Sequence, residues 1–196
     1  MKKVFYIVLL VVLGTLSSFA QTIKDFKLLK GEKEVEVVFK YTNLRMMKEN
    51  LTEAEYVQNH FKNLEKKDEG SGELWIKSWE RSKEDIWDPK FLLLTNKYVD
   101  RKVKFTKNAP NSTYILLVDV LWIYPGWDAG IVKQAAKVTS RVILVSRENP
   151  NVVLAQHKFD DMPGSQFGSN FNNESRIGEG FAKTGKDFAK KIVKSL

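Results

Sequence analysis

A nearly unbroken run of apolar side chains, Tyr114–Tyr124, constrains the fold of this chain more than any other feature. Asp119 alone interrupts it, which is typical of a central strand that is covered on one or both faces. Two further strands follow, Ala136–Ser146 with many β-branched residues and Val152–Phe159, and Asn149–Asn151 forms a turn between them. The three segments predict an antiparallel meander.

The first half of the chain mixes strand and helix patterns. Glu34–Tyr41 alternates apolar and polar side chains and predicts a strand. A Thr-x-x-Glu capping box opens Thr52–Lys67, whose apolar spacing predicts a helix. Leu74–Trp79 and Lys90–Thr95 predict further strands, and Tyr98–Phe105 adds another.

The C-terminal segment has the pattern of an amphipathic helix. Its large apolar residues share one face and its lysines the other, and small residues run beside the apolar face (Ile177, Phe181, Phe188, Ile192; Lys183, Lys186, Lys190, Lys194; Gly178, Ala182, Gly185, Ala189). This pattern favours a helix that packs on the core, with a membrane-surface helix as the alternative. We therefore expect one α/β domain over residues 21–196. It has a mixed or largely antiparallel sheet of about five strands, with the first and last helices on one face.

The N-terminus has the features of an export signal. Lys2 and Lys3 precede the apolar run Val4–Leu13, and Ser18-Phe19-Ala20 offers small residues for a signal peptidase. Residues 1–20 are therefore predicted to be a cleaved signal peptide, and the protein is expected in the periplasm or outside the cell. The chain has no cysteine, which excludes disulfides, thiolate metal sites and a lipid anchor on an N-terminal cysteine.

The charge of the chain is moderately basic and scattered. The sequence holds 32 basic and 24 acidic residues, and its net charge is +8. Such a surface favours weak contact with anionic membrane surfaces. Because an exported protein seldom meets nucleic acid, nucleic acid is not an expected partner.

Asp119 is the most unusual polar residue, because apolar residues are expected to share its face of the strand (Ile115, Leu117, Leu121, Ile123). A buried carboxylate needs a partner or a raised pKa, and a structural ion pair is the favoured interpretation. A catalytic role would require Asp119 to converge with Asp128 or Asp160 within about 5–10 Å, as in glycan hydrolases.

Signals for catalysis, metals or cofactors elsewhere in the chain are weak. His60 and His157 lie near no nucleophile motif and lack the spacing of metal ligands. Gly180–Lys186 matches the start of a phosphate-binding loop, but Asp187 stands where a magnesium-binding hydroxyl is required. The dense oxygen array of a calcium loop is also missing. We expect no enzyme activity, no metal and no cofactor.

Two loop segments carry aromatic residues that are costly to expose without a use. Trp127 and Asp128 follow a Pro-Gly turn, and Phe167 and Phe171 lie in the polar segment Asp160–Ser175, which is predicted to be a long loop. These four residues are the predicted recognition edge.

The second half of the chain resembles a family of exported bacterial proteins of unknown function, many of them lipoproteins. The resemblance rests on Leu117–Val120, Pro125-Gly126, Ala136–Val138, Val153–Ala155 and the closing helix. Such domains look similar to the amino-terminal domain of TolB, an α/β auxiliary module of envelope machines. The resemblance implies a module that binds partners and catalyses nothing.

The leading hypothesis is therefore a non-catalytic binding module of the bacterial envelope, with an envelope protein as its partner. Two different functions stay open. One is a soluble carrier of an apolar ligand, which needs a cavity of about 300 Å³ or more between sheet and helices. The second is the glycan-active hydrolase that uses carboxylates.

Overall fold

The computed structural model describes residues 25–129, 131–165 and 172–196. The predicted signal peptide and the predicted recognition residues Phe167 and Phe171 lie outside these ranges. Within them, the chain forms a mixed α/β fold, which confirms the expected fold class.

The elements follow one another as a first strand, a helical middle and a strand-rich second half that ends in a helix. In chain order they are η1 (Phe26–Leu29), β1 (Glu34–Lys40), β2 (Arg45–Met46), β3 (Leu51–Thr52), α1 (Glu53–Glu65), α2 (Ser71–Ser82), the π-helical turn η2 (Lys83–Trp87), α3 (Asp88–Tyr98), β4 (Lys104–Thr106), β5 (Tyr114–Tyr124), β6 (Trp127–Asp128), β7 (Lys133–Gln134), β8 (Ala136–Ser146), β9 (Val153–Gly164) and α4 (Asn173–Ile192).

The main sheet combines a parallel half with an antiparallel half. β1 lies between β4 and β5 and runs parallel to both. The predicted meander is confirmed, because β8 pairs antiparallel with β5 and β9 pairs antiparallel with β8. β6 and β7 pair only with each other and form a separate hairpin.

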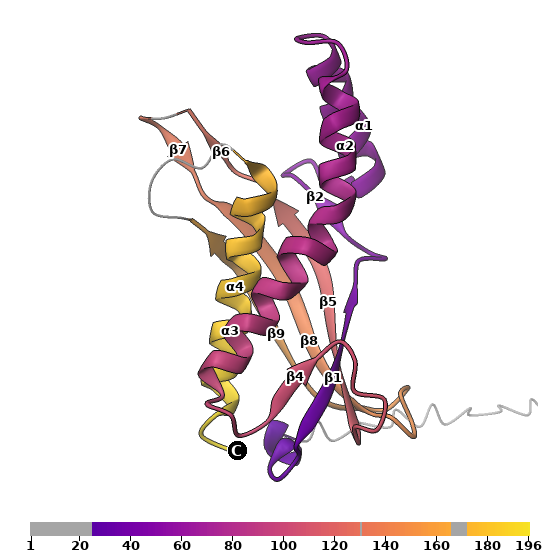
Figure 1. Ribbon diagram of the computed structural model, residues 1–196, viewed down its shortest axis with the longest axis vertical. Coiled ribbons are helices and arrows are strands. Elements are labelled where there is room, and N and C mark those ends of the chain that lie inside the picture. The colour runs from indigo at the N-terminus through magenta and orange to yellow at the C-terminus, as the bar shows by residue number, and fades with distance from the viewer. Residues whose placement is uncertain (1–24, 130, 166–171) are drawn as a thin grey trace, which may run out of the picture.

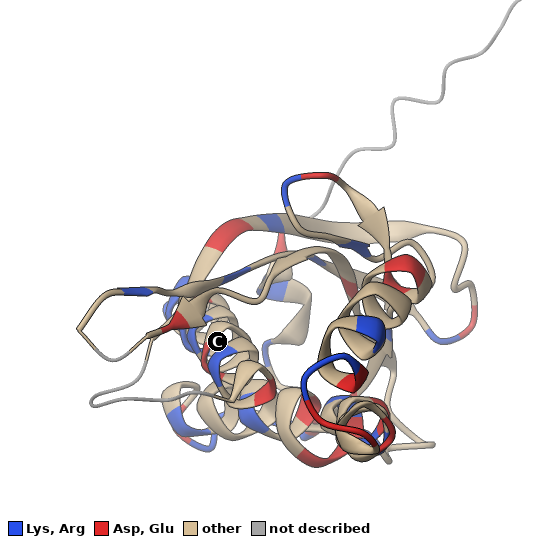
Figure 2. Ribbon diagram, turned by 90° about the horizontal axis from the view of Figure 1, so that it is seen from above, with Lys and Arg blue, Asp and Glu red and all other residues tan. Residues whose placement is uncertain are grey.

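The helices α3 and α4 cover one face of this sheet (Figures 1 and 2). The last helix therefore packs as predicted, whereas α1 packs mainly along α2, and α3 takes the place expected for the first helix. Large side chains that are almost fully buried fill the space between the layers (Trp79, Trp87, Phe91, Phe105, Phe181, Phe188, Leu116, Leu144). The Trp87 and Phe181 rings stack with centroids 5.6 Å apart and join α4 to η2.

Two predicted strands are wrong, because Leu74–Trp79 lies in α2 and Lys90–Thr95 lies in α3. Short apolar runs cannot distinguish a buried helix from a strand, and here the packing of Trp75 and Trp79 on Tyr56 of α1 accompanies the helix. The helical run continues past Pro89, which has no N–H to donate. The wider turn η2 precedes this proline and keeps the helix unbroken.

Two other predicted boundaries also need correction. Of Tyr98–Phe105, only the end from Lys104 forms a strand, because Asp100 and Arg101 adopt positive φ angles in a turn. The predicted loop Asp160–Ser175 is shorter than expected. β9 continues to Gly164 through its pairing with β8, and α4 begins at Asn173.

The contact between α3 and α4 depends on Gly185. A β-carbon at this position would lie 2.3 Å from the Phe91 carbonyl oxygen and 2.8 Å from Thr95 Oγ1. The absence of a side chain therefore lets the two helices approach until backbone meets backbone.

We predict that Gly185→Ala lowers the free energy of unfolding by about 1–3 kcal/mol, because the added methyl group overpacks this contact. The sign is informative, since the same change in a helix without this contact stabilises by about 0.5–1 kcal/mol. Urea unfolding measures the effect, with Lys191→Ala on the exposed face of α4 as the control. A stability gain for Gly185→Ala would contradict the close approach.

Candidate binding surface

The hairpin β6–β7 projects from the end of the main sheet (Figure 1). Three of its described residues are large, apolar and exposed: Ile131 is fully exposed and Val132 is 61% exposed at the tip, and Trp127 is 42% exposed nearer the base. Ala129 N–H donates to the Val132 carbonyl oxygen at 3.0 Å and closes the turn. The hairpin therefore presents three large apolar side chains among its described residues.

The base of the hairpin is held by a shared hydrogen-bond acceptor. Gln134 Oε1 accepts from the Tyr124 hydroxyl at 2.8 Å and from Trp127 Nε1 at 3.1 Å. Gly126 begins the turn with φ of +68°, and a β-carbon there would lie 2.3 Å from the Gln134 carbonyl oxygen. The Pro-Gly turn found in the sequence thus sets the position of Trp127.

Arg176, in the first turn of α4, fixes the hairpin from the other side. Its Nε donates to the Pro125 carbonyl oxygen at 3.2 Å, and its Nη2 donates to the Gly126 carbonyl oxygen at 3.3 Å. The guanidinium is buried, which lowers its pKa, while the charges of Asp128 and Glu174 act in the opposite direction. Asp128 therefore contributes to the electrostatics of this anchor as well as to the hairpin.

The same turn of α4 links the hairpin to the helical pair α1–α2. Arg176 also donates to the Asn173 side chain, and Asn173 Nδ2 lies 3.4 Å from the Tyr56 hydroxyl. Tyr56 packs in a cluster of rings with His60, Trp75 and Trp79. A continuous set of contacts therefore runs from the hairpin base to the projecting helices.

Glu174, in the first turn of α4, is the residue whose burial opposes folding. It is buried, and its Oε1 has no hydrogen-bond partner among the described residues. Burial raises the pKa of Glu174 above its ordinary value, and the backbone, Trp75 and Arg176 offset only part of this effect. Its main-chain oxygen is used, because it accepts from Trp87 Nε1 at 2.9 Å.

Asp119 lies on the face of the sheet opposite α3 and α4, where Arg141 on β8 stands directly across from it. Arg141 Nη2 donates to Asp119 Oδ2 at 2.8 Å. The expectation that Ile123 shares the strand face of Asp119 is wrong. A β-bulge at Leu121 reverses the alternation, so Ile123 turns to the helix-covered face and Trp122 to the side of Asp119.

The acids considered for catalysis have separate surroundings. Asp119 pairs with Arg141, and Asp160 pairs with Lys158 at 2.7 Å. Asp128 lies in the separate hairpin beside Arg176. The structure therefore offers no observation that favours a pair of catalytic carboxylates.

A metal site and a carrier cavity likewise gain no support from the described residues. His60 lies on α1 and His157 on β9, and the described ranges contain no group of three or more potential metal-binding side chains. The core between the sheet and α3–α4 is filled by buried aromatic and aliphatic side chains, and the hollow of 360 Å³ at the edge beside β1 is lined in part by charged residues, which do not suit an apolar ligand. No described helix combines the length and apolar character needed to span a membrane.

The sequence predicted Trp127 and Asp128 in a loop after the Pro-Gly turn but gave no prediction for Ile131 and Val132, which lie in the same hairpin. The signal for them is local: two adjacent β-branched apolar residues follow a glycine in a segment with no strand-length apolar pattern. Residues of this kind in a turn have no core to enter. They mark an exposed apolar tip.

The chain has few similarities to known proteins. No family model matches the chain, and no curated protein matches it. Among solved structures, the chain is similar to protein XCC0632 from Xanthomonas campestris, described with the family model DUF330. The identity is 15% and the TM-score is 0.36; the match covers 55% of this chain and spans only 61% of that protein. A likeness of this size carries no argument about fold or function.

The hydrogen bonds that Gln134 Oε1 accepts from Tyr124 and Trp127 give a first prediction for the hairpin. Gln134→Met removes the partner of the buried Tyr124 hydroxyl, which costs about 1–3 kcal/mol of stability, and loosens the hairpin. We expect the amides of residues 127–134 to exchange roughly 10-fold faster in hydrogen–deuterium exchange, following this loss of local stability. Gln156→Met, on an exposed position of β9, serves as the control. Unchanged exchange in the hairpin would show that Gln134 does not hold it.

Glu174 gives a prediction about pH. Because burial raises its pKa, ionisation of Glu174 opposes folding. This cost is absent below the pKa of an unfolded glutamate, about 4.3, and develops as the pH rises through the folded-state pKa. We expect Glu174→Gln to be more stable than the parent chain at neutral pH, with the difference shrinking toward about pH 4. Urea unfolding across this range measures it, and the exposed Glu69→Gln should show no such trend.

Proposed function

We propose that this protein is a non-catalytic binding module of the bacterial cell envelope, and that the hairpin β6–β7 is its recognition element for an envelope protein. The observation that carries the proposal is the apolar tip. Trp127, Ile131 and Val132 stand exposed on a hairpin whose base is fixed by Gln134 and Arg176.

The geometry suits binding for two physical reasons. Exposed apolar side chains gain free energy when a partner removes them from water, and tryptophan is among the strongest anchors at interfaces. A hairpin already held in place loses little conformational freedom on binding, so less of that gain is offset. The small size of the tip favours a modest or transient interface.

The envelope setting comes from the sequence. The predicted signal peptide over residues 1–20 and the resemblance to exported auxiliary modules both point to the periplasm or the cell exterior. Within this proposal, Asp128 helps to position the hairpin beside Arg176. Phe167 and Phe171 remain candidates for a second part of the same edge.

The test is capture of partners from the envelope fraction of the source bacterium, with the protein from Gln21 to Leu196 as bait. We expect Ile131→Asp with Val132→Asp to weaken capture of a reproducible protein partner. A charge in place of an anchor costs about 2–4 kcal/mol, so the dissociation constant should rise at least ~30-fold. The matched control is Leu93→Asp, since Leu93 is 64% exposed but lies on α3.

The comparison of the two variants shows whether capture depends on the hairpin tip or on any exposed apolar side chain. Loss of capture in the hairpin variant but not in Leu93→Asp supports the proposed recognition element. Equal capture by all three proteins would reject it. Copurification of lipid or glycan without a protein partner would reject the protein partner and favour an apolar-ligand carrier or a glycan hydrolase.

A further inference from the structure

One edge of the main sheet is only partly closed. β4 is short and pairs with β1 only over Glu34–Glu36, while β1 continues to Lys40. On its other side, β1 pairs with β5 over Glu36–Lys40. In the described chain, no strand therefore pairs with the last part of β1 on the side of β4.

The direction of the backbone groups at this edge follows from two hydrogen bonds. Lys104 N–H donates to the Lys33 carbonyl oxygen at 3.0 Å, which places residue 33 on the side of β4. Glu36 N–H instead donates to Ser112 Oγ at 3.3 Å, on the side of β5. Because bonding directions alternate along a strand, the Val37 carbonyl and the N–H and carbonyl of Phe39 face the open edge.

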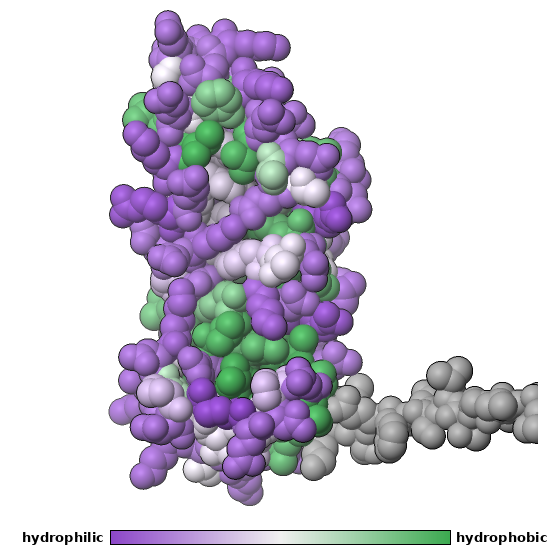
Figure 3. All heavy atoms as spheres, turned by 90° about the vertical axis from the view of Figure 1, so that its right-hand side faces the viewer, coloured by the Kyte–Doolittle hydropathy of each residue, from purple (hydrophilic) through white to green (hydrophobic). Residues whose placement is uncertain are grey.

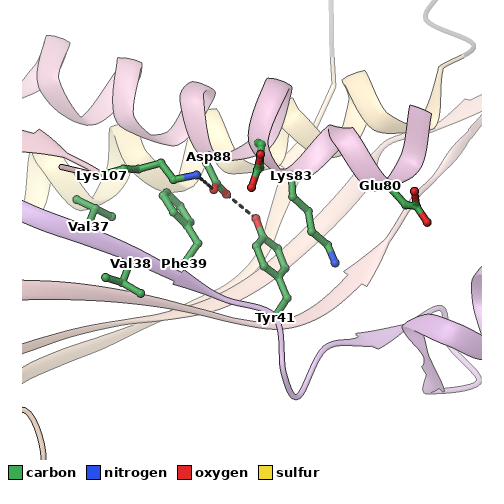
Figure 4. A pocket seen from close by; sticks show the side chains of 9 residues that line it. Val37, Val38, Phe39, Tyr41, Glu80, Lys83, Asp88 and Lys107 are labelled. Carbon is green, nitrogen blue, oxygen red and sulfur yellow. Dashed lines mark hydrogen bonds and ion pairs between the residues drawn. The ribbon is translucent and has the colours of Figure 1, made fainter. Parts of the chain in front are cut away.

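A hollow of 360 Å³ lies against this edge, between β1 and the helical run that carries η2 (Figure 4). We call it the β1 slot. Its floor is Val37, Val38 and Phe39, and its helical wall includes Lys83 and Asp88. Lys107 closes one end, near the Phe39 ring. Apolar residues are gathered on the lower part of this side of the molecule, bordered by hydrophilic ones (Figure 3).

The β1 slot is lined by charges of both signs, and Lys107 is its most exposed cation with a buried partner. Asp88 accepts from the Tyr41 hydroxyl at 2.7 Å and from Lys107 Nζ at 2.8 Å, and its side chain is only 4% exposed. Lys107, by contrast, keeps 46% of its side chain exposed. Lys83 pairs with Glu53 at 2.7 Å and lies over the Tyr41 ring.

The two ammonium groups each have three N–H donors, so one carboxylate contact leaves capacity for another acceptor. Glu80 and Glu84 are exposed on the helical rim and limit how much negative charge fits there. The cation available to an acidic group in the slot is therefore Lys107, whose Nζ lies 6.0 Å from the centre of the Phe39 ring.

We propose that the β1 slot binds an extended segment of a partner polypeptide, which adds to β1 as a further strand and places an acidic side chain beside Lys107. Main-chain hydrogen bonds to Val37 and Phe39 supply the attachment, as in known cases of strand addition. Proteins protect open strand edges with bulges, prolines, charged side chains or a covering helix or loop. The stretch Val37–Phe39 is short, contains no proline and pairs with β5 in unbroken register, and Lys107 is the charged side chain at its end.

This site is independent of the hairpin, and its test is separate. A displayed library of short random peptides is selected against the protein from Gln21 to Leu196, and the best peptide is synthesised. We expect it to contain an acidic residue. The synthetic peptide is then made in two N-methylated forms, in which alternate amides are blocked.

Strand addition makes an asymmetric prediction. Methylation of the amides that face β1 should weaken binding by ~10-fold or more per pair of lost bonds, and methylation of the other set should not. In hydrogen–deuterium exchange, the Phe39 amide should become protected when the peptide binds. Equal effects of the two methylated peptides, or no protection at Phe39, would overturn the proposal.

A protein variant tests the charge. Lys107→Met should weaken binding of the acidic peptide, whereas Lys102→Met should not, because Lys102 donates to the Val193 carbonyl oxygen away from the slot. Removal of Lys107 also affects the buried Asp88, so a circular dichroism melt checks that the variant folds. A selection that yields no peptide, or only peptides whose binding is lost in the Ile131→Asp, Val132→Asp variant, rejects the slot and leaves the hairpin proposal untouched.

Discussion

The packing of α4 against α3 and the sheet is the constraint that positions both proposed surfaces of this molecule. At Gly185 the helix lies against the backbone of α3, and at Phe181 it stacks on Trp87 of η2. Its first turn then carries Arg176 to the carbonyl oxygens at the base of the hairpin. Because protein interiors are close-packed, a shift of α4 would move the hairpin and the helical run together.

The region around the first turn of α4 combines rigidity with an energetic cost. Arg176 and Gln134 hold the hairpin with several hydrogen bonds, while Glu174 keeps a buried oxygen without a partner among the described residues. Polar groups of this kind lower stability. Glu174 precedes Arg176 by two residues, so this cost lies next to the residue that anchors the hairpin base.

The two proposed surfaces differ in which groups they leave exposed. The hairpin leaves side chains without a core, since two short strands cannot bury Trp127, Ile131 and Val132 by themselves. The β1 slot leaves main-chain groups open, since β4 ends before β1 does. The helical run α2–η2–α3 connects them, because it forms a wall of the slot and packs on α4.

Local patterns in the chain were enough to predict the α/β class, the meander of β5, β8 and β9, the capped start of α1 and the amphipathic α4. These elements have long periodic patterns or local caps, whose physical basis lies within each segment. The same reasoning placed Trp127 in an exposed turn and anticipated that Asp119 requires a partner.

The remaining features depend on contacts between distant parts of the chain. Leu74–Trp79 and Lys90–Thr95 are helical because their apolar residues pack on α1, α4 and the sheet, a choice that short runs leave open. The bulge at Leu121, the pairing of Asp119 with Arg141 and the contacts of Arg176 all join residues that are far apart in the chain. Their partners are set by register and by helix packing, which no local pattern encodes.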